Sequence, residues 1–219
     1  MKKLQITSAI TFVSAWLIGL ALAASGPKPS DSAHTIANYY ASHEHTAMLA
    51  HLLIDGIAGA AIIALAVGLR RYLASDSKRA SWMFAAGIAA GATSLFQAAV
   101  GETMTYRAAH GASAASVRTL FDVLNNADTV KIALLAVMIG AASLLARRAG
   151  AFPRWLATGG LWFAPLLAVS GNAFPLNSSA IYATLELTLI GLLAWVIAST
   201  VAVARRTVRA TPETAAAVV

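Results

Sequence analysis

The chain has 219 residues, of which 58% are hydrophobic and only 11% are charged. Soluble domains contain about 45–50% apolar and about 25% charged residues, so this composition excludes a soluble globular domain and a disordered chain. Long apolar runs are typical of a protein embedded in the bilayer. The absence of cysteine excludes disulfides, thiolate metal sites, iron–sulfur clusters and a cysteine nucleophile.

Six apolar segments each come close to the roughly 20 residues that a membrane-spanning helix needs. None alternates strictly between apolar and polar residues, so we expect helices and not barrel strands. The sequence therefore predicts an all-α polytopic membrane protein with a single six-helix bundle over residues 1–204 and a cytoplasmic tail over 205–219. The predicted helices cover residues 6–24, 46–69, 81–104, 121–146, 155–174 and 179–204.

The first segment has a second interpretation. Met1-Lys2-Lys3, the apolar run and Ala21-Leu22-Ala23 also resemble a secretory signal peptide with an A-x-A cleavage site. We favour a retained helix, because the apolar run is longer than the about 7–15 residues of a signal-peptide core.

The net charge of +7 would favour nucleic-acid binding in a soluble protein. Here the basic residues form short clusters between apolar runs, so we interpret them as orientation signals and expect no nucleic-acid partner. With a cytoplasmic N-terminus, 12 of the 16 Lys and Arg residues lie inside: Lys2, Lys3, Arg70, Arg71, Lys78, Arg79, Arg147, Arg148, Arg154, Arg205, Arg206 and Arg209. This predicts a multi-pass protein of a bacterial plasma (inner) membrane with both termini in the cytoplasm.

Two longer loops, over 25–45 and 105–120, are predicted on the outer side. In the first, Ser30-Asp31 is a candidate N-cap, followed by a short helix over 32–42 lying on the membrane surface. In the second, Ser113 is expected to start the fourth long helix early.

Polar residues gather in the outer half of the predicted bundle. Successive helices alternate in direction. Polar residues early in the second, fourth and sixth helices therefore lie at the same depth as polar residues late in the third and fifth helices. The expected ligand-binding set is His51, Asp55, Gln97, Glu102, Asp122, Asn126, Asp128, Lys131, Asn172, Tyr182 and Glu186. Five of these are carboxylates, and Lys131 is the one buried cation expected to face them, so an outward pocket that attracts a cation is predicted. The alternative interpretation is a purely structural one, in which the pairs His51–Asp55 and Asp128–Lys131 only hold helices together.

Three functional classes follow from this pattern. The leading one is non-enzymatic: binding, sensing or translocating a small cationic or protonatable ligand. The alternatives are an intramembrane metal-dependent hydrolase, with His51, Asp55 and Glu186 holding a divalent cation, and an accessory subunit. A haem is disfavoured, because only His51 lies within a helix at depth. Gly87-x-x-x-Gly91 predicts a close helix contact, while the oligomeric state stays open.

Three stretches carry a resemblance: residues 36–43 (IANYYASH), 120–126 (LFDVLNN) and 147–157 (RRAGAFPRWLA). In order and spacing they resemble a bacterial family of integral membrane proteins described as domain of unknown function 4386. The resemblance covers about residues 6 to 204. It implies the six-helix topology, and it implies no catalytic activity.

Overall fold

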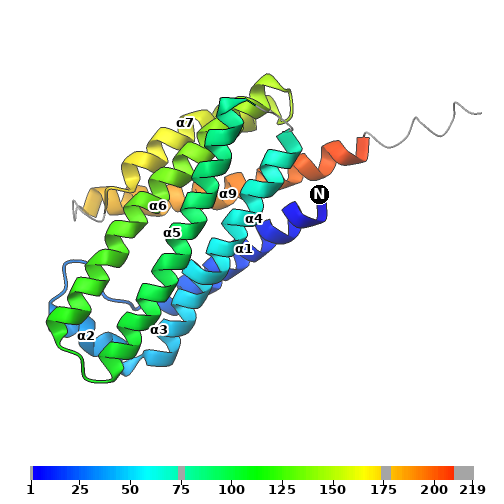
Figure 1. The fold of residues 1–219 in the computed structure, drawn as a ribbon. Coiled ribbons are helices and arrows are strands. Elements are labelled where there is room, and N and C mark those ends of the chain that lie inside the picture. Colours follow the sequence, from blue (N-terminus) through cyan, green and yellow to red (C-terminus); the bar gives the residue numbers. More distant parts are fainter. Residues whose placement is uncertain (1, 74–76, 174–178, 210–219) are drawn as a thin grey trace, which may run out of the picture.

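The computed structural model describes residues 2–73, 77–173 and 179–209, apart from the side chains of residues 2, 179, 180, 182 and 206–209. Over these residues the chain is helical and contains no strand. The elements are α1 (Lys2–Ala23), α2 (Ala33–Ser42), α3 (Glu44–His51), the π-helix η1 (Leu52–Ile57), α4 (Ala58–Leu73), α5 (Lys78–Ala109), α6 (Ala114–Arg148), α7 (Arg154–Ser170) and α9 (Ser179–Arg209). The long helices pack side by side in one bundle (Figure 1), which confirms the predicted all-α class.

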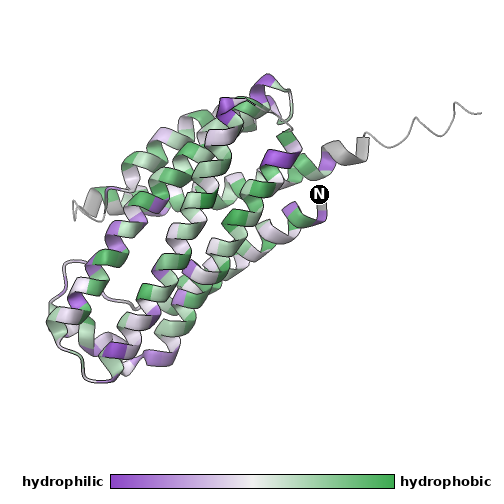
Figure 2. Ribbon diagram, in the orientation of Figure 1, coloured by the Kyte–Doolittle hydropathy of each residue, from purple (hydrophilic) through white to green (hydrophobic). Residues whose placement is uncertain are grey.

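Among the residues that the structure describes, five helical stretches are long and apolar enough to cross a membrane: Lys3–Ala23, Glu44–Leu73, Lys78–Ala109, Ala114–Arg148 and Ala183–Arg205. Figure 2 shows hydrophobic residues along these helices and hydrophilic ones concentrated toward the ends of the bundle. Helix α7 has 17 residues and ends at Ser170, short of the predicted boundary at residue 174. The structure thus supports a multi-pass membrane protein with five candidate spans, and the sixth span stays a prediction.

The helices extend beyond the apolar runs from which they were predicted. Ser113 caps α6 by accepting a hydrogen bond from the Ser116 N–H, so this helix starts seven residues before residue 121. Ser77 caps α5 in the same way, through the Ala80 N–H. The last helix continues to Arg209, so residues 205–209 belong to α9 and not to a tail. The boundaries differ because polar caps and basic last turns lie outside the hydrophobic pattern.

Helix α2 forms where a short helix was predicted, but its cap and its neighbours differ from the expectation. Ser32, and not Ser30-Asp31, accepts the hydrogen bond from the Thr35 N–H. Ile36 and Tyr40 are buried in a cluster with Met104 of α5 and Phe121 of α6. Helix α2 therefore packs on the protein and closes one end of the bundle, which we call the α2 end. The N-terminus of α1 lies at the other end, the terminal end (Figure 1).

Small residues allow the central helices to approach closely. A Cβ atom at Gly87 would lie 2.5 Å from the Cβ of Ala66 in α4, and one at Gly91 would lie 2.8 Å from the backbone oxygen of Gly59. The predicted contact of the Gly87–Gly91 motif is therefore made within the chain, between α5 and α4. This close approach fixes how α4 and α5 are rotated about their axes, and so which side chains they turn toward each other.

Candidate functional site

The site begins with an irregular turn in the second spanning stretch. Residues Leu52–Ile57 form a π-helical turn, in which the Ala58 N–H donates to the carbonyl of Leu53, five residues back. Such turns contain an extra residue, lack the ordinary hydrogen-bond register and are frequent at functional sites. This one holds Asp55 and lies about 16 Å along the helix from Glu44. The turn thus places a carboxylate well inside a candidate membrane span.

Four charged or titratable side chains form a connected network, the Asp55 network, which consists of His51, Asp55, Asp128 and Lys131. Lys131 Nζ lies 3.1 Å from Asp55 Oδ1 and 2.7 Å from Asp128 Oδ1. His51 Nδ1 lies 3.4 Å from Asp55 Oδ2. The ammonium group of α6 is therefore held between a carboxylate of its own helix and one from η1, which lies 76 residues away in the chain.

The network carries unequal charge. Two carboxylates face one ammonium group, so these three groups together carry a net charge of −1. Asp55 is 6% exposed and Lys131 is 8% exposed, so water screens these charges poorly. One additional positive charge would balance the network.

A cavity of about 230 Å³ opens beside these charges. Asp55, Asp128, Lys131 and His51 line it together with Ser94 of α5, and its remaining wall is apolar: Phe12, Trp16, Leu20, Ile54, Ile62, Ile132, Leu135, Leu189 and Leu192. The Ser94 hydroxyl is buried and has no hydrogen-bond partner. The cavity thus combines excess negative charge with a free hydroxyl, and its volume suffices for several water molecules or one small ligand.

Neighbouring residues hold His51 in place. Its ring lies against Gly101 of α5, where a Cβ atom would approach His51 Cγ to 2.5 Å. The ring of Tyr40 stacks on it with a centroid distance of 6.1 Å, and Tyr40 also contacts Phe121 at 6.3 Å. Burial raises the pKa of the Tyr40 phenol above its usual range, with smaller contributions from Tyr39 and Asp55. Helix α2 thus covers the His51 side of the network with a neutral aromatic residue.

The structure separates the other predicted carboxylates from this network. Asp122 pairs with Arg118 on its own helix at 2.9 Å, and Arg118 also donates to the backbone oxygen of Asp31 at 2.8 Å. Glu102 is half-buried and Glu186 is exposed on α9. The expectation of five carboxylates in one cluster is therefore not met, because each helix turns its acidic residues in a direction set by its own packing.

The described uncharged polar residues of the predicted site also differ in their burial and in their hydrogen-bond partners. Gln97 is buried and donates to the Leu124 backbone oxygen at 3.0 Å, which ties α5 to α6. Asn126 and Asn172 are exposed, and Asn172 bonds only to backbone oxygens of its own helix. The Tyr182 side chain lies outside the described residues. Among the side chains described, no three His, Asp or Glu residues come together as a metal-binding group, so His51, Asp55 and Glu186 are not assembled into one.

Sequence reasoning missed Ser94 and the contribution of α1. Ser94 lies three residues before Gln97 on α5, and this helical spacing was the available signal that both face the interior. Phe12 and Trp16 of α1 were indistinguishable from lipid-facing residues, because an apolar wall and an apolar membrane surface have the same composition. The Arg118–Asp122 pair could have been read from its i,i+4 spacing.

Together, the fold and this network indicate a multi-pass helical membrane protein with a cavity lined in part by charged side chains. Comparison with known proteins adds no relative: no family model, no curated protein and no solved structure matches the chain.

Proposed function

We propose that this membrane protein binds a small cation or a protonatable ligand in the cavity beside the Asp55 network. The observation that carries the proposal is the position of Lys131 Nζ, between Asp55 and Asp128 at 3.1 and 2.7 Å, on the wall of a cavity that also contains the partnerless Ser94 hydroxyl. The lysine ammonium occupies the place that a soluble cation would take. Lys131 is thus an internal, tethered competitor for that ligand.

Protons take part in the same balance. A cation that enters the cavity neutralises the excess negative charge, and a proton taken up by the network does so as well. Ligand binding and protonation of the network therefore compete, and affinity falls as the pH is lowered. This competition would let the protein sense, or couple to, protons and a small cation at one site.

The first test measures the thermal stability of the purified protein with methylammonium, guanidinium, Na⁺ and divalent metal ions, at neutral pH and in mild acid. A cation at about 100 times its dissociation constant should stabilise the protein by about 2.7 kcal/mol. We expect stabilisation at neutral pH that shrinks in acid and is lost in Asp55→Asn. If none of these cations stabilises the protein at either pH, the proposal is wrong.

A second test uses the tethered cation itself. The Lys131→Ala variant truncates the side chain at Cβ, which removes an n-propylammonium group and leaves both carboxylates, so added n-propylammonium should stabilise it saturably. The uncharged n-propanol has the same chain and serves as the matched control. The triple variant Asp55→Asn/Asp128→Asn/Lys131→Ala should respond to neither compound. Equal effects of amine and alcohol would show simple filling of space and count against cation binding.

The accessory-subunit interpretation is a second candidate, and one observation favours it. Both oxygens of Asp55 have partners, and further buried polar contacts join helices, such as the 2.7 Å contact between the Ser170 and Thr188 hydroxyls. In that case the network fastens helices and the cavity holds only water. The cation panel separates the two candidates, because a purely structural network gains nothing from added cations.

Location, orientation and family membership belong to the same proposal. We propose that the protein lies in a bacterial inner membrane with both termini in the cytoplasm and six spans, of which α7 is the fifth in chain order. The basic residues at the terminal end, among them Lys3, Arg71, Arg148 and Arg205, support this orientation through the positive-inside rule. The resemblance of residues 36–43, 120–126 and 147–157 to domain of unknown function 4386 supports the family assignment.

A further inference from the structure

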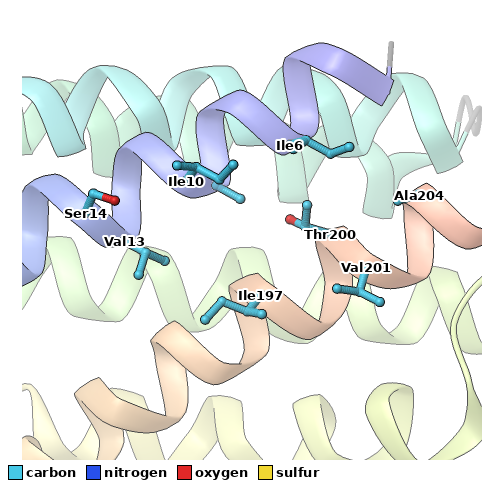
Figure 3. Close-up of a pocket in the computed structure, with 9 residues that line it drawn as sticks. Ile6, Ile10, Val13, Ser14, Ile197, Thr200, Val201 and Ala204 are labelled. Carbon is cyan, nitrogen blue, oxygen red and sulfur yellow. The ribbon is translucent and has the colours of Figure 1, made fainter.

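An apolar groove runs between the first and the last helix, on the outside of the bundle. It has a volume of about 400 Å³ and is lined by Ile6, Ala9, Ile10, Val13 and Ser14 of α1 and by Ile197, Thr200, Val201 and Ala204 of α9. Figure 3 shows the labelled residues of α1 along one side of the groove and those of α9 along the other, with the helices closer together near Ile6 and Ala204 than near Ser14. Several of the lining residues are exposed on the outside of the bundle: Ile10 is 61% exposed and Ile197 is 49% exposed.

The length of the groove matches one leaflet of a bilayer. From Lys3 to Ser14 the helix rises about 16 Å, and from Arg205 to Ile197 it rises about 12 Å. Half of a typical hydrocarbon core is about 15 Å thick. A single acyl chain can therefore lie along the groove within one leaflet, with its headgroup at the terminal end.

The positive charge at the terminal end of the groove favours a lipid with an anionic headgroup. Lys3 and Arg205 are exposed and stand one turn or less beyond Ile6 and Ala204. Helix α1 contains no acidic residue, and the single acidic residue of α9, Glu186, lies about 28 Å along the helix from Arg205. No carboxylate of α1 or α9 therefore offsets these two positive charges where a lipid phosphate would lie.

A polar group of the groove wall fits the lipid region next to the phosphate. The Thr200 hydroxyl lines the groove five residues before Arg205, and it is buried without a hydrogen-bond partner. At this depth a glycerolipid carries its ester carbonyls, which accept hydrogen bonds. The hydroxyl thus supplies a donor where the acyl chain joins the headgroup.

We propose that the groove between α1 and α9 is a binding site for an anionic phospholipid, with one acyl chain between Ile10 and Ile197, the ester region at Thr200 and the phosphate at Lys3 and Arg205. The site is separate from the cavity of the Asp55 network. Through it the lipid would join α1 to α9, the two helices that also supply Trp16 and Leu192 to the cavity wall.

Native mass spectrometry of the full-length protein tests the proposal. Delipidated protein receives equal amounts of phosphatidylglycerol and phosphatidylcholine with identical acyl chains. We expect preferential retention of phosphatidylglycerol, and a drop in its affinity of about fivefold for each basic residue removed in Lys3→Gln/Arg205→Gln. The matched control Arg147→Gln/Arg148→Gln removes two exposed arginines at the end of α6 and should leave the preference unchanged.

A second pair of variants tests the groove with its charges intact. Ser14→Leu/Ala204→Leu fills the groove and should lower retention of phosphatidylglycerol several-fold. Ala133→Leu adds the same side chain to an exposed position of α6 and should have no effect. Three results would each overturn the proposal. The unmodified protein could retain both lipids equally, or Lys3→Gln/Arg205→Gln and Arg147→Gln/Arg148→Gln could lose the same affinity for phosphatidylglycerol. The third is a groove-filling variant that binds phosphatidylglycerol normally. A dimer mass that groove filling abolishes would assign the groove to a second copy of the chain, and would overturn it as well.

Discussion

At the scale of single residues, the members of the Asp55 network are not equivalent. Lys131 is the one ammonium group in the network and contacts both carboxylates, whereas Asp55 and Asp128 share it. Removing one carboxylate leaves a neutral pair, and removing the ammonium leaves two buried negative charges side by side. Breaking a buried pair is costly mainly because it strands an uncompensated charge.

This asymmetry predicts unequal losses of stability. Lys131→Met should lower the free energy of unfolding by about 3–5 kcal/mol, because both carboxylates lose their counterion. Asp55→Asn should cost less than about 1 kcal/mol, because Lys131 keeps Asp128 and the amide oxygen still accepts a hydrogen bond. Denaturant unfolding in detergent micelles measures both values. Similar losses in the two variants would show that the charges do not act as a network.

The packing of His51 on Gly101 leads to a second prediction. In Gly101→Ala the new methyl group would lie 2.5 Å from His51 Cγ, so the ring must shift from its present position beside Asp55. We expect a loss of about 1–3 kcal/mol, which is typical of overpacking in a filled interior. Gly159→Ala is the matched control, since a Cβ atom there meets nothing within 4 Å. The control should be neutral or slightly stabilising, because alanine favours the helix.

At the scale of elements, α2 follows the loop after α1 and packs on α5 and α6 at the α2 end of the bundle. Its buried face carries Ile36 and Tyr40, and Arg118 of α6 holds the start of the helix through the backbone oxygen of Asp31. The helix has 10 residues, which is too short to be stable alone in water. Its stability therefore depends on its docking over His51.

The buried Tyr40 makes this docking sensitive to alkali. Because the pKa of its phenol is raised in the folded protein, its contribution to stability is complete below the unfolded pKa of about 10 and is lost as the pH rises above it. The protection of residues 33–42 against hydrogen exchange, corrected for the base-catalysed intrinsic rate, should fall in this range. Tyr40→Phe should abolish much of this fall, and Tyr106→Phe, at an exposed position, should leave it unchanged. An identical alkaline response in all three proteins would contradict the burial argument.

At the scale of the whole molecule, the proposed orientation places the basic end of the bundle in the cytoplasm. Ala115 and Ala149 lie at opposite ends of α6, and both are exposed. Because the chain has no cysteine of its own, Ala115→Cys and Ala149→Cys provide clean labelling sites. We expect an impermeant maleimide to label Ala115→Cys in intact cells, and to label Ala149→Cys only after the membrane is opened. The reverse pattern would invert the proposed orientation.

The sequence by itself determined what depends on local spacing. Apolar runs of sufficient length predicted the long helices, Ser113 predicted the early start of α6, and i,i+3 and i,i+4 spacings predicted the pairs Asp128–Lys131 and His51–Asp55. These features follow from the period of the helix and from its unsatisfied first N–H groups, which are properties of neighbouring residues.

Only the tertiary structure decided which residues meet between helices. The Asp55–Lys131 contact and the Ser94 hydroxyl in the cavity wall depend on how far each helix is rotated about its axis. That rotation is set by packing, such as the close approach of Gly59 and Gly91, and by the π-helical turn that shifts the register at Asp55. Glu186 was predicted to face the other carboxylates but is exposed, because the direction of a side chain depends on how the neighbouring helices pack.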